Sequence, residues 1–150
     1  MKAGPNDFLG RFREIISDPL NILIKRNSLS GMVDKYGYVY LHNGNKVPIS
    51  GENSYYGSFS NILIVNRGVH EPLEEFCFQE TLKKITEHKP TMIELGSYWA
   101  HYSMWFLKNF PKANCFMVEP DKKALISGYN NFQTNNFSNG FQHPPYTLTL

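Results

Sequence analysis

The stretch Thr91–Asp121, TMIELGSYWAHYSMWFLKNFPKANCFMVEPD, decides the predicted fold of this chain. Its two apolar runs, TMIEL and NCFMVEP, have the length and composition of buried strands. Between them, GSYWA is a turn and HYSMWFLKNF is a helical pattern that Pro111 ends. A second helical pattern, DKKALISGYNNFQTNN, follows with Asp121 near its start.

The segment before this stretch, VHEPLEEFCFQETLKKITEH, predicts another helix. Pro72 stands in its first turn, three glutamates lie near its N-terminal end and two lysines near its C-terminal end, an order that suits the helix dipole. Its expected apolar face comprises Leu73, Phe76, Cys77, Phe78, Leu82 and Ile85. The resulting alternation of helices and strands predicts a parallel α/β sheet with helices on its faces and both strand C-termini at one edge.

The N-terminal third has the character of an accessory layer. DFLGRFREII has helical spacing, and SDPLNILIKRN restarts with Asp18 as a cap and Pro19 in the first turn. YGYVYLHNGNKVPIS predicts a hairpin that turns at Asn43-Gly44 and has an edge strand at Pro48. SNILIVNRG is either a buried strand or a short connecting element.

Composition sets broad limits. The 150 residues are 41% hydrophobic and 15% aromatic, enough for one domain with a core. A net charge of +2 gives no electrostatic footprint for nucleic acid, and no signal pattern or membrane-length apolar segment is present. Cys77 and Cys115 lack metal-type spacing and are expected to be buried, reduced thiols, so we expect a cytoplasmic protein.

A carboxylate ends each predicted strand, Glu94 the first and Glu119 the second. Ligands of open parallel sheets bind outside the C-terminal ends of the strands, so both carboxylates are expected to face one crevice. Gly96 allows a tight turn, and the next helix points its free N–H groups at the crevice. An acid after the second strand can accept hydrogen bonds from both hydroxyls of a ribose. These features predict a nucleoside site.

The sequence of the same turn favours one class of nucleoside ligand over another. A nicotinamide-dinucleotide site would need GxGxxG to seat a pyrophosphate, and the turn lacks the second glycine. Glu94 would repel a pyrophosphate, but it suits a cationic ligand. S-adenosylmethionine carries a sulfonium, an α-amino group and a ribose, and it has no phosphate.

The segments IELGSYWAHYS and FMVEPDKKALISGYNNFQTNN resemble the class I S-adenosylmethionine-dependent methyltransferases, and within them the FkbM-type family. That family's first motif is roughly Asp-Val-Gly-Ala-Asn-x-Gly-Tyr-Tyr-Thr, and its second begins Glu-Pro. YLHNGNKVPI and NRGVHEPLEEFCFQE also resemble the leader of a subgroup. The resemblance implies a Rossmann-like, three-layer αβα sheet, of which this chain has an incomplete part. We therefore expect a helical and hairpin extension over residues 1–70, and the N-terminal half of the methyltransferase domain over residues 71–150.

By this resemblance, the turn and the end of the second strand hold the cofactor. Glu94 and Gly96 would hold its methionine end, Glu119 its ribose, and Pro120 and Asp121 would lie beside the adenine. The remaining turn residues complete the expected site: Ser97, Tyr98, Trp99 and Ala100. Tyr98 and Ala100 depart from the family's Asn and Gly, and the bulky Tyr98-Trp99 pair alters the loop path or supplies a stacking wall.

Other polar residues have ordinary structural interpretations. His101 and Ser103 are expected to be idle rather than catalytic, and no catalytic residue is assigned. His70 with Glu71, Glu74 and Glu75 is interpreted as an acidic helix start, so no metal site is predicted. In the alternative interpretation of this segment, the cofactor pocket is lined by Arg67, His70 and Glu71. Tyr98, Trp99, Tyr102 and Trp105 are expected in the core or the pocket wall.

Three functions remain open. The first is methyl transfer to a hydroxyl of a small molecule or saccharide, with the chain supplying the cofactor-binding half and ending before the acceptor half. The second is a non-catalytic nucleoside-binding or interaction module on the same fold. The third, a dinucleotide-dependent oxidoreductase, is disfavoured by the missing GxGxxG. The tail NGFQHPPYTLTL, with Pro144-Pro145, suggests an N-terminal fragment with an exposed sheet edge.

Overall fold

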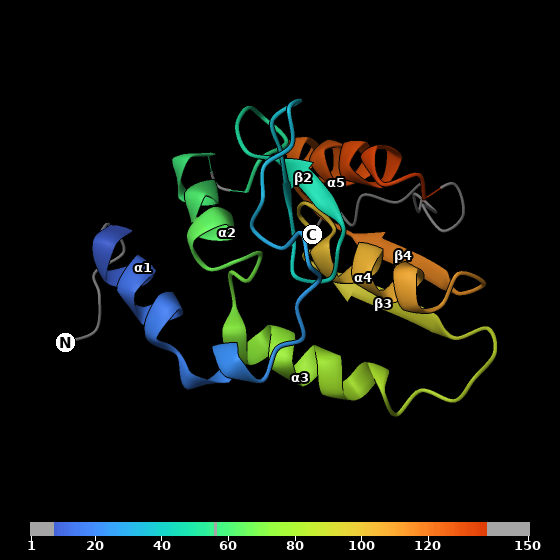
Figure 1. Ribbon diagram of the computed structural model, residues 1–150. Helices are drawn as coiled ribbons and strands as arrows, with labels where there is room; N and C mark the ends of the chain where they lie inside the picture. The colour runs from blue at the N-terminus through green and yellow to red at the C-terminus, as the bar shows by residue number, and fades with distance from the viewer. Residues whose placement is uncertain (1–7, 56, 138–150) are drawn as a thin grey trace.

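The computed structural model describes residues 8–55 and 57–137 (Figure 1). Strands β3 (Thr91–Leu95) and β4 (Asn114–Val118) lie parallel, with Ile93 opposite Phe116. Helix α4 (His101–Asn109) connects them and packs on both, and helix α5 (Lys122–Thr134) follows β4. The mixed α/β class and the predicted order of these elements are confirmed.

The parallel sheet has two strands within the described residues. Helix α4 covers one of its faces, as Figure 1 shows. Alternate side chains of β3 point to the other face, where Ile93 is 64% exposed and Leu95 77% exposed. No described helix therefore covers this second face at β3, where the sequence pattern predicts helices on both faces.

The predicted hairpin is confirmed. Strands β1 (Tyr38–Tyr40) and β2 (Lys46–Pro48) are antiparallel. Gly44 has a φ of +81° in the turn, where its N–H donates to the Leu41 carbonyl at 2.9 Å. Asn135, which follows α5, bonds the main chain of Lys46 at the outer edge of β2. Its Oδ1 accepts from the Lys46 N–H at 2.8 Å, and its Nδ2 donates to the Lys46 carbonyl at 2.7 Å.

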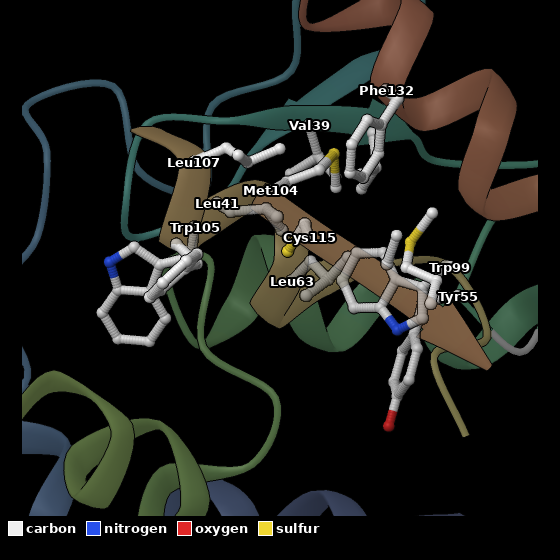
Figure 2. Close-up of a cluster of buried hydrophobic side chains, with 14 of the residues drawn as sticks. Val39, Leu41, Tyr55, Leu63, Trp99, Met104, Trp105, Leu107, Cys115 and Phe132 are labelled. Atoms are coloured by element: carbon white, nitrogen blue, oxygen red, sulfur yellow. The ribbon is translucent and has the colours of Figure 1, made fainter. Parts of the chain in front are cut away.

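One hydrophobic cluster joins this hairpin to the parallel sheet. Val39 and Leu41 lie in it beside Met104, Cys115 and Phe132 (Figure 2). The core positions expected for Trp99 and Trp105 are confirmed, since both are nearly inaccessible to solvent. The N-terminal segment and the α/β segment thus share a core.

The segment from residue 60 to residue 68 is helical as far as Val65 and then forms a turn. It continues η2 (Gly57–Asn61) as α2 (Ile62–Val65), so the buried-strand alternative is wrong and the connecting element is what forms. Ile62 and Leu63 are buried whereas Ile64 and Val65 are exposed, a pattern of adjacent pairs that a strand cannot produce. Tertiary packing overrides the strand preference of β-branched residues here.

Both N-terminal helical elements form, but the second is a single 3₁₀ turn, shorter than the predicted helical segment. Helix α1 (Phe8–Ser17) packs Phe8 and Phe12 edge-to-face against Phe59, with ring centroids 5.1 and 5.0 Å from it. The short 3₁₀ helix η1 (Pro19–Ile22) is capped by Asp18, which accepts from the Leu20 N–H at 2.8 Å. None of the helices in the described ranges is both long and apolar enough to cross a membrane.

Helix α3 (Pro72–Leu82) buries only part of the predicted face: Leu82 is buried and Phe78 and Ile85 pack against the core, but Leu73 and Cys77 are exposed. Its buried residues are Pro72, Glu75, Gln79 and Leu82, whereas Leu73 is 60% exposed. Gln79 is buried because it bonds backbone of the N-terminal segment, accepting from the Lys25 N–H at 2.7 Å and donating to the Leu23 carbonyl at 3.1 Å. Cys77 is exposed, which corrects the predicted buried thiol, while Cys115 is buried as expected.

Candidate functional site

The turn after β3 is anchored to the end of β4. The N–H groups of Gly96 and Ser97 both donate to the Val118 carbonyl, at 2.8 and 3.3 Å. Gly96 has a φ of +70°, and no atom lies within 4 Å of the position a Cβ would occupy there. The turn therefore needs a glycine for its backbone conformation and leaves open space beside it.

The two departures from the FkbM-type motif fall where the backbone is left-handed. Tyr98 has a φ of 41°, and Ala100 has φ 64° and ψ 35° at the N-cap of α4. Asparagine and glycine, the residues of the family pattern, are those that tolerate this conformation best. The turn thus places two non-glycine residues in the left-handed backbone conformation.

Replacement of Ala100 by glycine is expected to stabilise the protein. The change Ala100→Gly relieves the left-handed strain and raises the free energy of unfolding by about 0.5–1 kcal/mol, after the extra entropy of glycine in the unfolded chain. Urea denaturation measures it. Ala113 is also buried and is not among the positive-φ residues, so Ala113→Gly should destabilise the protein. Equal losses in both variants would contradict the strain argument.

Glu94 caps the helix that follows the turn. Its Oε2 accepts from the Ser103 N–H at 3.0 Å and from the Ser103 hydroxyl. Burial raises the pKa of Glu94 to about 7, against the hydrogen bonds from Ser103 that lower it. Ser103 therefore has a structural role as the partner of this carboxylate.

Glu119 holds the turn from the neighbouring strand. Its Oε2 accepts from the Tyr98 N–H at 3.0 Å, and its Oε1 accepts from the Asp121 N–H at 2.9 Å. Asp121 in turn caps α5 by accepting from the N–H groups of Lys123 and Ala124 at 2.7 and 2.9 Å. Glu94 and Glu119 thus lie at one edge of the sheet, where Glu94 bonds the first turn of α4 and Glu119 bonds the turn before it.

A cavity of about 270 Å³ lies at this edge. The predicted residues that line it are Glu94, Gly96, Ser97, Tyr98 and Trp99; those outside its lining are Ala100, Glu119, Pro120 and Asp121. The segment before α3 contributes His70 and Glu71 to the cavity lining, whereas Arg67, the third residue of the alternative interpretation, does not line it. The other lining residues are Tyr55, Glu74, Leu95, His101 and Tyr102.

Sequence reasoning missed Tyr55 and Glu74 as lining residues. Tyr55 packs against Trp99 with tilted rings whose centroids are 5.1 Å apart, and Figure 2 shows the two side chains together. Glu74 accepts from the Tyr102 hydroxyl at 3.3 Å. Glu74 could have been found from the sequence, because helical spacing places it one turn from Glu71. Tyr55 lies in an irregular segment, where no sequence pattern indicates which way its side chain points.

The cavity wall is acidic. Glu71, Glu74 and Glu94 contribute three carboxyl groups. Burial raises the pKa of Glu71, the neighbouring His70 lowers it, and Glu74 raises it further. The Ser97 hydroxyl is buried and has no hydrogen-bond partner among the described residues. This wall favours a cation and offers a hydroxyl group to a ligand.

A buried group of side chains lies behind the cavity. We call His42, His70, His101 and Glu75 the histidine–glutamate cluster; each is at most 2% exposed. Glu75 Oε2 lies 2.8 Å from His42 Nε2, and Glu75 Oε1 lies 2.7 Å from His70 Nδ1. Oε1 also accepts from the N–H groups of His70 and Glu71, at 2.9 and 3.0 Å, which fixes the carboxylate at the start of α3.

The environment sets the charges in this cluster. Burial raises the pKa of Glu75, but the imidazoles of His70 and His42 outweigh it and hold that pKa well below its usual range. Burial and the nearby His70 hold the pKa of His101 well below its usual range, so this imidazole is neutral at pH 7. The expected helix-start role of Glu75 is correct, but it omits the buried histidines, and His42 was missed altogether.

The chain has no significant match among protein-family models, curated proteins or solved structures. The residues and the geometry of the site therefore carry the functional argument.

Proposed function

We propose that the chain binds S-adenosylmethionine at the C-terminal edge of β3 and β4, as the cofactor-binding part of a methyltransferase. The acidic cavity at this edge is the observation that carries the proposal. Glu94 and Gly96 line it, and Glu119 of the adjacent strand bonds the same turn. Open parallel α/β sheets bind ligands at this position.

The residues fit the methionine end of the cofactor. Carboxylates at Glu71, Glu74 and Glu94 favour an ammonium and a sulfonium group. The aromatic wall at Tyr98 and Trp99 suits a cation as well. The bare backbone at Gly96 lets a ligand approach closely.

The ribose end is assigned to Glu119. Each of its carboxylate oxygens accepts one backbone N–H and keeps capacity for a second donor, so two adjacent hydroxyls match it. The 270 Å³ cavity is smaller than the roughly 300–1,000 Å³ typical of sites for whole organic ligands. We therefore assign the cavity to the methionine end, and place the nucleoside outside it, along Glu119 and beside Pro120 and Asp121.

When bound, S-adenosylmethionine supplies a methyl group on a good sulfonium leaving group. The chain's own residues bind and orient it, and positioning contributes most of the rate. We propose a hydroxyl of a small molecule or saccharide as the acceptor. We also infer a Rossmann-like, three-layer arrangement, because a further layer would cover the exposed Ile93 and Leu95.

A non-catalytic nucleoside-binding module is the second candidate. The hydrogen bonds of Glu94 favour this candidate. Its Oε2 caps α4 by accepting two hydrogen bonds from Ser103, so this oxygen is already occupied. Saturable binding without methyl transfer to any hydroxyl acceptor would support this candidate.

Isothermal titration of S-adenosylhomocysteine into the chain tests the proposal, with NAD as the control ligand. We expect saturable binding of the first ligand only. Glu119→Gln keeps an acceptor for the Tyr98 N–H but loses the charge, so affinity should fall about tenfold or more. Glu80→Gln removes a carboxylate beside Lys83 on α3 and should leave affinity unchanged. Equal binding of NAD, or an unaffected Glu119→Gln, would contradict the proposal.

The pH dependence of the same titration tests Glu94. Because its pKa is about 7, this carboxyl is largely protonated at pH 6 and ionised at pH 8. Ionised Glu94 attracts the α-ammonium of the ligand, so affinity should rise across this range. Glu94→Gln should flatten the rise, and an unchanged pH profile in this variant would remove Glu94 from the site.

A further inference from the structure

The histidine–glutamate cluster has the donor set of a transition-metal site. One ligand atom from each of His42, Glu75 and His101 lies within 4.8 Å of the others. Imidazole nitrogens with one carboxylate are typical ligands of Zn²⁺ and related divalent ions, whereas Mg²⁺ and Ca²⁺ take oxygen ligands. The three residues come from separate segments, so the fold creates this set.

The hydrogen bonding of these residues is incomplete. Both ring nitrogens of His101 are buried and have no hydrogen-bond partner among residues 8–55 and 57–137. His42 Nε2 and Glu75 Oε2 approach to 2.8 Å, yet neither atom has an aligned hydrogen bond within that same part of the chain. Buried polar groups are normally satisfied, so the unpartnered imidazole nitrogens beside this carboxylate keep their capacity to bind an ion.

The His42–Glu75 pair requires only a small adjustment, whereas the His101 nitrogen, which lies within 4.8 Å of the other two ligand atoms, has to approach by up to about 1.4 Å. Two ligand atoms about 2.1 Å from a tetrahedral ion lie roughly 3.4 Å apart. His42 Nε2 and Glu75 Oε2 would separate by about half an ångström from their 2.8 Å contact. Glu75 Oε1 is fixed by two backbone N–H groups and lies 2.7 Å from His70 Nδ1, the kind of outer support that orients a metal-binding carboxylate.

Cavities reach the cluster from two sides. His70 and His101 line the 270 Å³ cavity at the sheet edge. His42 lines a second cavity of about 440 Å³, together with Gln79 and Trp105. The ligand atoms themselves are buried between these cavities, so side-chain movement admits an ion and a fourth ligand.

We propose that His42, Glu75 and His101 bind a first-row transition-metal ion of the Zn²⁺ type, with His70 positioning Glu75. This site goes beyond the proposed cofactor site, because the ion and its ligands require no nucleoside.

Zn²⁺ alone is the probe, titrated into the full chain after treatment with a chelator and with no nucleoside present. We expect one ion per chain, a rise in Tm, and visible absorption typical of four-coordinate Co²⁺ when Co²⁺ is added and then displaced by Zn²⁺. His101→Gln should weaken Zn²⁺ binding by at least about tenfold. His88→Gln, the same change at an exposed histidine, should leave binding intact.

Absence of Zn²⁺ binding by the wild-type chain overturns the proposal. Binding that His88→Gln abolishes, or that a folded His101→Gln retains in full, also overturns it. If His101→Gln does not fold, X-ray absorption at the zinc edge of the wild-type chain decides: two imidazole ligands support the site, and a sphere without imidazole overturns it. These results are independent of nucleoside binding.

Discussion

Gly68→Ala is expected to lower the free energy of unfolding by at least about 3 kcal/mol, a large fraction of the stability of a typical domain. Gly68 has a φ of +82°, and its carbonyl accepts from the His42 N–H at 3.2 Å. An added Cβ would lie 2.2 Å from the His42 nitrogen and 2.5 Å from the Leu41 carbonyl carbon. These are backbone atoms of the hairpin, so the segment before α3 would have to separate from it.

Gly37→Ala is the matched control. Gly37 has a φ of +81°, and no atom lies within 4 Å of its Cβ position. The Gly37→Ala variant should therefore lose only the free energy of backbone strain, about 1–2 kcal/mol of the free energy of unfolding. Urea denaturation followed by circular dichroism compares the two variants, and similar losses of stability would show that close approach at Gly68 is unimportant.

Glu75→Ala should lower the free energy of unfolding by about 3–5 kcal/mol, measured in the presence of a chelator so that no metal contributes. The substitution removes a fully buried carboxylate between His42 and His70. It also leaves the N–H groups of His70 and Glu71 without their acceptor.

Glu80→Ala serves as the control for this prediction. Glu80 lies on the same helix and forms an exposed pair with Lys83, so its loss should leave stability almost unchanged. A Glu75→Ala variant as stable as Glu80→Ala would mean that the histidines find other partners.

The α/β segment was predictable because its signals are local. Apolar runs marked β3 and β4, Pro111 ended the helix between them, and Asp121 capped the next one. Asn43-Gly44 likewise marked the hairpin turn. Each of these signals acts within a few residues, so neighbouring sequence suffices to detect it.

The buried face of α3 was not predictable from the same rules. Leu73, Phe76, Cys77 and Phe78 are spread around the helix and give no single apolar face. Gln79 is buried because backbone groups of the N-terminal segment, more than fifty residues away, satisfy its amide. No local pattern encodes such a partner.

The candidate site was predictable in part for a similar reason. The turn and its two carboxylates lie in one stretch of the sequence, and the structure brings them to one sheet edge. His42, Glu75 and His101 come from three segments whose meeting depends on how the hairpin and α3 pack against α4. Metal-spacing rules detect ligands that are close in sequence, so these residues escape them.

The two hydrogen bonds between the Asn135 side chain and the Lys46 main chain, here called the Asn135 clasp, also set the order in which parts of the chain can fold. The two residues are 89 positions apart, so the clasp cannot close until nearly all of the described chain has left the ribosome. Until then the outer edge of β2 is an unpaired strand edge that other chains can join. Contacts of such long sequence separation slow folding, because a large loop must close before they form. Completion of α5 is therefore the step that ends this period of exposure.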